Sequence, residues 1–221
     1  GIYVKHFENN EVDPIMITIG RITNTESNIT NINRIFCARI KDGFSDITDI
    51  SSSSALIKGA NFKDIDGFGD SVYTVGNVGV VSFNINETTT TITIPEETSK
   101  VQNSSPVYNT VSAFDISNAV IAGEKSIKHT TDAGKTWTPD KVYINDEIYG
   151  GSDSSFNITK VSMLHDGRGM AIGTYINQDI TSGVILYTLS GSGKWQDVPN
   201  DRAFYSFGNE DVLRSPSIND F

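Results

Sequence analysis

One group of carboxylates in the sequence could bind a cation. The segment Asp-Ile-Asp-Gly-Phe-Gly-Asp begins at Asp64, and oxygen-bearing side chains spaced in this way can wrap a hard ion such as Ca²⁺. The pattern is incomplete, because Phe68 stands where a third ligand is usual and Val72 occupies a later ligand position. Two interpretations follow: a calcium site formed by Asp64, Asp66 and Asp70, or an acidic turn that leads into a strand.

No other pattern of reactive residues predicts catalysis or metal binding. His6, His129 and His165 have no metal-ligand spacing, and the single cysteine, Cys37, lies in an apolar segment typical of a buried strand. The sequence has no Gly-x-Ser-x-Gly nucleophile motif and no phosphate-binding glycine loop between a strand and a helix. We therefore predict no catalytic residue, and no cofactor other than the calcium ion considered above.

Composition narrows the class of protein. The chain has 221 residues, 37% of them hydrophobic, which is enough for one domain with a full core. Its formal net charge of −10 argues against a nucleic-acid partner, because phosphate contacts need clustered Lys and Arg. No apolar run approaches the roughly 20 residues that span a bilayer, so membrane insertion is not expected.

The pattern of residue types along the sequence predicts β-structure built from repeats. Short runs of Val, Ile, Thr, Tyr and Phe alternate with Gly, Asn, Asp and Ser, whereas helical periodicity is hard to find. A strand ending in glycine occurs at 72–76, 119–123 and 169–173, and a second strand follows each time. The glycines that end these strands are about 50 residues apart, which is in the range of propeller blades.

A tight turn is predicted at Thr-Thr-Asp-Ala-Gly-Lys-Thr-Trp, which begins at Thr130. Asp132 can accept hydrogen bonds from the amides of its own turn, and Gly134 can supply the positive φ that tight turns need. Trp137 then opens the returning strand and offers a large ring to a neighbouring layer. A second segment, from Thr188 to Trp195, keeps the Thr-to-Trp spacing but has serine at the Asp and Gly positions.

These residues resemble the Asp-box (BNR) repeat family, whose pattern is Ser/Thr-x-Asp-x-Gly-x-Thr-Trp. Thr130, Asp132, Gly134, Thr136 and Trp137 fill every characteristic position of that pattern. The resemblance implies an all-β propeller of four-stranded antiparallel blades, in which the Asp-box is a structural turn between the third and fourth strands. A β-sandwich of alternating strands is the alternative fold.

The repeat register divides the chain into units. We expect a single domain over 1–221 with about four to five blades, or a segment of a larger propeller. The predicted blades are 1–50, 51–98, 105–145 and 157–199, with terminal closing strands in 200–221.

The resemblance places functional loops at the end of the blades opposite the Asp-box. Two segments fall there by register, 140–156 and 174–182. Tyrosine beside Asn and Asp is a common composition for recognising sugars or proteins, because the ring stacks and the polar groups fix orientation. The predicted ligand-binding residues are Tyr143, Tyr149, Asp153, Tyr175, Asn177 and Asp179.

The expected function is non-catalytic binding or assembly, with a glycan or a protein as the partner. Attachment proteins among the members of the resembled family favour a virion-surface or extracellular location. The alternative is a segment of a sialidase-like glycoside hydrolase, which would need three converging arginines. Arg21 faintly resembles the first of these, but Arg34 and Arg39 share one strand and Arg168 lies in a turn, so no triad is evident. Arg202 and Arg214 follow near the end of the sequence. The oligomeric state is left open.

Overall fold

The computed structural model describes residues 2–5, 15–22, 32–39, 48–49, 61–77, 79–85, 90–93, 107–149, 155–177 and 180–198. Every regular element among them is a β-strand. The all-β prediction is therefore confirmed for this part of the chain. No helix in it is long and apolar enough to cross a membrane.

The described strands form four sheets, three with four strands and one with six, and each contains four strands that follow one another in sequence and pair antiparallel. The first sheet contains β1 (Ile2–Lys5), β2 (Ile15–Ile22), β3 (Ile32–Arg39) and β4 (Thr48–Asp49). The second contains β5 (Phe62–Phe68), β6 (Ser71–Gly76), β7 (Gly79–Ile85) and β8 (Thr90–Thr93). The third contains β9 (Tyr108–Ala113), β10 (Ala119–Gly123), β11 (Ser126–Thr130) and β12 (Thr138–Pro139). The fourth contains β15 (Ser155–Met163), β16 (Gly169–Asn177), β17 (Ile180–Thr188) and β18 (Lys194–Asp197).

A hairpin of β13 (Lys141–Ile144) and β14 (Glu147–Tyr149) extends the fourth sheet, because β13 pairs in parallel with β18. The segment 140–156 is therefore not simply the surface loop that the sequence suggested. Likewise, β16 and β17 run through most of 174–182 as paired strands. In both segments alternate residues pair or pack within a sheet, which loop composition does not reveal.

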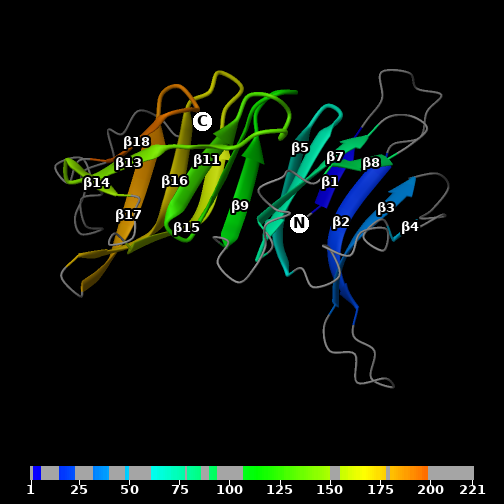
Figure 1. Ribbon diagram of the computed structural model, residues 1–221, viewed down its shortest axis with the longest axis horizontal. Coiled ribbons are helices and arrows are strands. Elements are labelled where there is room, and N and C mark those ends of the chain that lie inside the picture. The colour runs from blue at the N-terminus through cyan, green and yellow to red at the C-terminus, as the bar shows by residue number, and fades with distance from the viewer. Residues whose placement is uncertain are drawn as a thin grey trace, which may run out of the picture.

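The sheets stand side by side in a row, from the first at one end to the fourth at the other (Figure 1). Among the described strands no sheet closes on itself, and the row of four sheets is open at both ends. Neighbouring sheets pack on one another, since β5 contacts β1, β2 and β9, β6 contacts β9, and β15 contacts β9 and β10. This arrangement of small antiparallel sheets is compatible with both predicted architectures.

In the second, third and fourth sheets a glycine allows the first strand to pass close to the second. A Cβ atom on Gly76, Gly123 or Gly173 would collide with the backbone carbonyl of residue 61, 107 or 157, respectively. A register shift in the pairing of the first and second strands lies beside each contact. The glycines that the repeat analysis identified are therefore explained by close backbone approach at a bulge.

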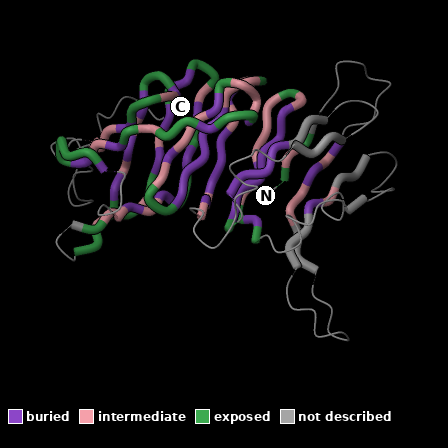
Figure 2. Tube along the Cα trace, in the orientation of Figure 1, coloured by how far each residue is buried: buried purple, intermediate pink, exposed green. Residues whose placement is uncertain are grey.

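The third sheet buries both of its faces (Figure 2). On one face Val111, Ile121 and Trp137 pack against Tyr73 and Val75 of the second sheet. On the other face a larger cluster, which includes Val120 and Ile127, packs against side chains of the fourth sheet, including Leu186 and Trp195. The core is thus divided into slabs between successive sheets.

The segment from Thr130 to Trp137 forms a tight turn between β11 and β12. The Asp132 carboxylate accepts hydrogen bonds from the Thr136 amide (2.9 Å) and hydroxyl (2.7 Å) and from the Thr130 hydroxyl (2.8 Å). The Thr130 hydroxyl in turn accepts one from the Gly134 amide (2.9 Å), and Gly134 has φ +80°. Trp137 is buried with its ring edge-on to Tyr73, 5.7 Å between centroids.

The related turn from Thr188 to Trp195 is stabilised differently. Ser190 reaches only the carbonyl of Ser192 (3.0 Å) and does not bridge to the returning strand. Instead, the Asp140 carboxylate in the preceding β12–β13 connection accepts hydrogen bonds from the Gly193 amide (2.8 Å) and the Trp195 indole (2.9 Å). His129 of β11 also contacts Asp140, so an aspartate between the third and fourth sheets closes the turn of the fourth.

We predict that Asp132→Ala lowers the free energy of unfolding by about 1–2 kcal/mol, because it removes the acceptor that closes the turn. Ser190→Ala is the matched control, and we expect a change within about 0.5 kcal/mol because Ser190 makes a single exposed contact. Urea denaturation of both variants measures the difference. Equal effects in the two variants would contradict the assigned role of Asp132.

The destabilisation should also depend on pH. Burial acts to raise the pKa of Asp132, but hydrogen bonds from Thr136, Thr130 and Lys135 outweigh it and hold the pKa below its ordinary value. A lowered pKa in the folded state means that the stabilisation is present above the unfolded pKa and is lost as the pH falls through the folded one. The gap between wild type and Asp132→Ala should therefore be widest near neutral pH and shrink in acid.

Candidate functional site

The first strands of successive sheets lie next to one another along one edge of the stack. β5 contacts β9, and β9 contacts β15. Each of the three is an edge strand of its own sheet, so alternate backbone amides point outward without a strand partner. Side chains of the preceding sheet satisfy several of these amides.

Two carboxylates of β5 bind the edge of the third sheet. Asp64 Oδ2 accepts a hydrogen bond from the Val111 amide (3.2 Å), and Asp66 Oδ2 accepts one from the Ala113 amide (3.0 Å). The Thr110 hydroxyl adds a third contact, to Asp64 Oδ2 (2.9 Å). The acidic segment is therefore part of a strand that is attached to its neighbour by its side chains.

The same arrangement is repeated one sheet further along. The Thr110 hydroxyl accepts a hydrogen bond from the Val161 amide (3.2 Å), and the Ser112 hydroxyl accepts one from the Met163 amide (3.1 Å). We call the four acceptors Asp64, Asp66, Thr110 and Ser112, with the amides they bind, the inter-sheet ladder.

Beside the ladder runs a line of polar side chains that begins near the start of each first strand. Lys63 Nζ donates to Asn109 Oδ1 (2.6 Å), and Asn109 Nδ2 donates to Asn157 Oδ1 (2.6 Å). Each of these three residues follows a buried aromatic residue, namely Phe62, Tyr108 and Phe156. Lys160, with a side chain 58% exposed, pairs with Asp64 at 2.9 Å. We call Lys63, Asn109, Asn157 and Lys160 the polar row.

The Asp66 carboxyl group has a raised pKa. Burial raises its pKa, and the nearby charge of Asp64 adds to the effect, whereas hydrogen bonds from Ala113 and Gly67 and the charge of Lys160 oppose it. Because the folded state favours the protonated form of Asp66, this group contributes to stability below its unfolded pKa. That contribution is lost as the pH rises through the folded pKa. The amides of Gly67 and Ala113 therefore bind an ionised Asp66 carboxylate whose charge burial disfavours.

The predicted calcium ligands do not converge. Asp64 and Asp66 accept hydrogen bonds from the third sheet, whereas Asp70 lies in the turn after β5. Within the described ranges there is no group of three or more His, Cys, Asp or Glu side chains that could hold a metal ion.

The predicted tyrosines do not form one cluster. Tyr149 is buried and meets Tyr175 edge-on, 5.9 Å between ring centroids, on the side of the fourth sheet that packs against the third. Tyr143 alternates with Val142 and Ile144, which belong to that core, so it lies on the opposite face, with Lys194 Nζ 4.8 Å from its ring centroid. Asp153, Asp179 and the side chain of Asn177 lie outside the described residues.

Of the arginines considered for a carboxylate clamp, three belong to the first sheet and one lies in a turn of the fourth. Arg21 belongs to β2, and Arg34 and Arg39 belong to β3. Arg168 lies in the turn between β15 and β16, at the other end of the row, where its Nε donates to Asp166 Oδ2 (2.7 Å). Arg202 and Arg214 fall outside the described residues.

Sequence reasoning missed the polar row and the ladder. For the polar row a usable signal existed, because an aromatic residue followed by Lys or Asn opens three successive units, at Phe62-Lys63, Tyr108-Asn109 and Phe156-Asn157. No model of a known protein family matches this sequence, and no curated protein matches it either.

We predict that Asp64→Ala destabilises the fold by about 1–3 kcal/mol, because it leaves the Val111 amide and the Thr110 hydroxyl without their acceptor. Lys160→Ala removes only the ion pair, and because that lysine is mostly exposed we expect a loss of less than about 1 kcal/mol. Thermal and urea unfolding of both variants test this order. A larger effect for Lys160→Ala would mean that the ion pair, and not the ladder, joins the sheets.

Proposed function

We propose that the chain is a non-catalytic binding and assembly module, whose four sheets are blades of a propeller-like arc. Three features support the propeller interpretation: the four-stranded meanders, the parallel alignment of their first strands, and the turn between β11 and β12 with Trp137 packed on the preceding sheet. The Asp-box resemblance accounts for the same turn from sequence.

The observation that carries the proposed binding role is the polar row. It places amide and ammonium groups at equivalent positions of three successive sheets and joins Lys63, Asn109 and Asn157 by hydrogen bonds. Lys63 and Lys160 are exposed, and Asn109 and Asn157 are half-buried. A line of fixed donors and acceptors suits a ligand rich in hydroxyl or amide groups, which is to say a glycan or a protein segment.

The carboxylates nearest the row, Asp64 and Asp66, accept hydrogen bonds from the edge of the third sheet, so a structural role accounts for them. Asp132 has a structural role of its own in the turn between β11 and β12. The row lies at the opposite end of the third sheet from that turn. Asn109 is near the start of β9, whereas Thr130 pairs with Ala119, which in turn pairs with Ala113 at the end of β9.

The proposal predicts that Lys63→Ala weakens ligand binding about tenfold, equivalent to roughly 1.4 kcal/mol. The matched control is Lys135→Ala, which removes an exposed lysine from the turn at the other end of the blade and should change affinity less than about twofold. A glycan array selects the ligand, and titration of that glycan with each variant measures the affinity.

Equal losses in the two lysine variants would place the ligand elsewhere. A fluorogenic sialoside assay addresses the hydrolase alternative, and turnover that survives purification would overturn the non-catalytic role. An array with no bound glycan, together with no turnover, would direct the search to protein partners.

A further inference from the structure

The fourth sheet has one face turned away from the third sheet, and two lysines lie next to each other on this outer face. The core between the third and fourth sheets contains Val142 of β13 and Trp195 of β18. Because side chains alternate along a strand, Lys141 and Lys194 point to the outer face. The parallel pairing of β13 with β18 places these two exposed residues directly opposite each other.

Neither lysine forms an ion pair with a carboxylate in the part of the chain that the structure describes. Asp140 accepts its hydrogen bonds on the core side of the sheet, and Asp197 accepts one from the hairpin of β13 and β14. The acidic residues 146–147 lie at the other end of β13 from Lys141. Like charges directly opposite each other across two strands repel. An anionic group bound between Lys141 and Lys194 would remove that repulsion.

A line of aromatic and amide side chains crosses the same face beside the lysines. Tyr143 of β13 is opposite Gln196 of β18, and Gln196 is opposite Tyr187 of β17. Neighbouring strands lie about 4.8 Å apart, so the two tyrosines stand about 10 Å apart with the glutamine between them. The Tyr187 hydroxyl contacts Gln196 Oε1 at 3.5 Å, and all three side chains are half-buried. Lys194 Nζ is 4.8 Å from the centroid of the Tyr143 ring, so positive charge lies beside the first ring.

We call this group the tyrosine–lysine face. It consists of Lys141, Tyr143, Tyr187, Lys194 and Gln196. A tyrosine ring can stack on the apolar face of a sugar ring, while the tyrosine hydroxyl and the glutamine amide can bind sugar hydroxyls. Two rings at this spacing on a continuous sheet suit an extended polymer with a regular repeat. The adjacent ammonium groups add a preference for carboxylate or sulfate groups on that polymer.

Other anionic polymers fit this face less well. Nucleic acids require several clustered Lys and Arg to contact their phosphates, whereas this face offers two unpaired lysines. Lys160, which is opposite Ile172 in the same sheet, already pairs with Asp64. An acidic protein segment would gain most from exposed apolar side chains such as Ile172 and Ile176 of β16, which lie beyond Tyr187 from the lysines.

We propose that the tyrosine–lysine face binds an acidic polysaccharide, with its acidic groups between Lys141 and Lys194 and its sugar rings stacked on Tyr143 and Tyr187. In a chain of net charge −10, much of the remaining surface repels such a polymer, which directs it to this positive region. The site is separate from the polar row, whose residues in this sheet belong to β15 at the opposite edge. The proposal therefore does not depend on the ligand of that row.

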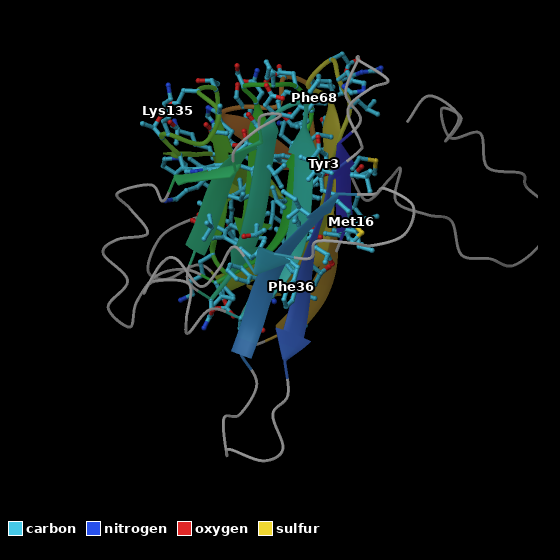
Figure 3. The ribbon with its side chains drawn as sticks, turned by 90° about the vertical axis from the view of Figure 1, so that its right-hand side faces the viewer. Tyr3, Met16, Phe36, Phe68 and Lys135 are labelled. Carbon is cyan, nitrogen blue, oxygen red and sulfur yellow. The ribbon has the colours of Figure 1, made fainter. Side chains whose placement is uncertain are left out.

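The other end of the row of sheets differs in character. It faces the viewer in Figure 3, where Met16 and Phe36 of the first sheet are labelled. Both are partly buried apolar residues, and each alternates along its strand with a buried isoleucine. Adjacent lysines beside aromatic rings thus distinguish the outer face of the fourth sheet from these described positions of the first.

Calorimetric titration of the full chain with polygalacturonate tests the proposal, and the fully methyl-esterified form of the polymer is the matched uncharged probe. Wild type should bind the acidic polymer more weakly as salt is added, and should bind the ester at least about tenfold more weakly than the acid. Lys194→Ala and Tyr143→Ala should each weaken binding of the acidic polymer about tenfold. Tyr143→Phe keeps the ring and should change the affinity less than about threefold.

Two further lysine variants serve as controls. Lys135→Ala alters the turn between β11 and β12, where Figure 3 labels the residue, and Lys63→Ala alters the polar row. Both should bind polygalacturonate as wild type does. Tyr187→Ala replaces Tyr143→Ala if circular dichroism shows that the latter does not fold.

Four outcomes would overturn the proposal. The first is no binding of polygalacturonate or of dextran sulfate, a second acidic polymer, and the second is equal binding of the acid and its ester. The third is a loss of affinity in Lys63→Ala as large as that in Lys194→Ala, which would place the polymer on the polar row. The last is tighter binding of polyglutamate or single-stranded DNA than of polygalacturonate, which would assign the face to an acidic protein or a nucleic acid.

Discussion

The structure depends on satisfying the outward-pointing amides of edge strands. Each sheet has only four strands in its meander, and its first strand would leave unpaired donors along one side. Side chains of the preceding sheet provide the acceptors: two carboxylates between the second and third sheets, and two hydroxyls between the third and fourth. This requirement fixes the spacing and height of one sheet relative to the next, which hydrophobic packing alone leaves adjustable.

The apolar slabs then supply the driving force for stacking. Two of these apolar clusters contain a buried tryptophan. Trp137 lies between the second and third sheets, and Trp195 lies between the third and fourth. The two turns that deliver these rings use different acceptors. Asp132 closes its own turn, whereas Asp140, in the connection between β12 and β13, binds the turn before Trp195. The loss of aspartate from the second motif is thus compensated across the interface between sheets.

Much of this organisation could be predicted from the sequence because it is local. Gly76 and Gly123 marked the ends of second strands, and the residues from Thr130 to Trp137 marked a turn, since both patterns arise from backbone geometry within a few residues. The strand predicted to end at Gly173 instead continues to Asn177. The hairpin of β13 and β14 was missed because its partner strand begins at Lys194, about 50 residues later in the sequence. The tyrosines were grouped by composition, yet Tyr143 and Tyr149 lie on opposite faces because side chains alternate along strands. The ladder could not be read in advance, since an aspartate that binds a neighbouring sheet looks the same in sequence as one that binds a cation.

Hydrogen exchange at single amides tests this account most directly. The amides of Val111, Ala113, Val161 and Met163 point away from their own sheets and are held only by side chains of the preceding one. The account predicts that all four exchange as slowly as amides paired between β10 and β11, which lie inside a sheet. Exchange of these four at the rate of amides in the exposed turns would contradict it, because the sheets would then be held in register by apolar packing alone.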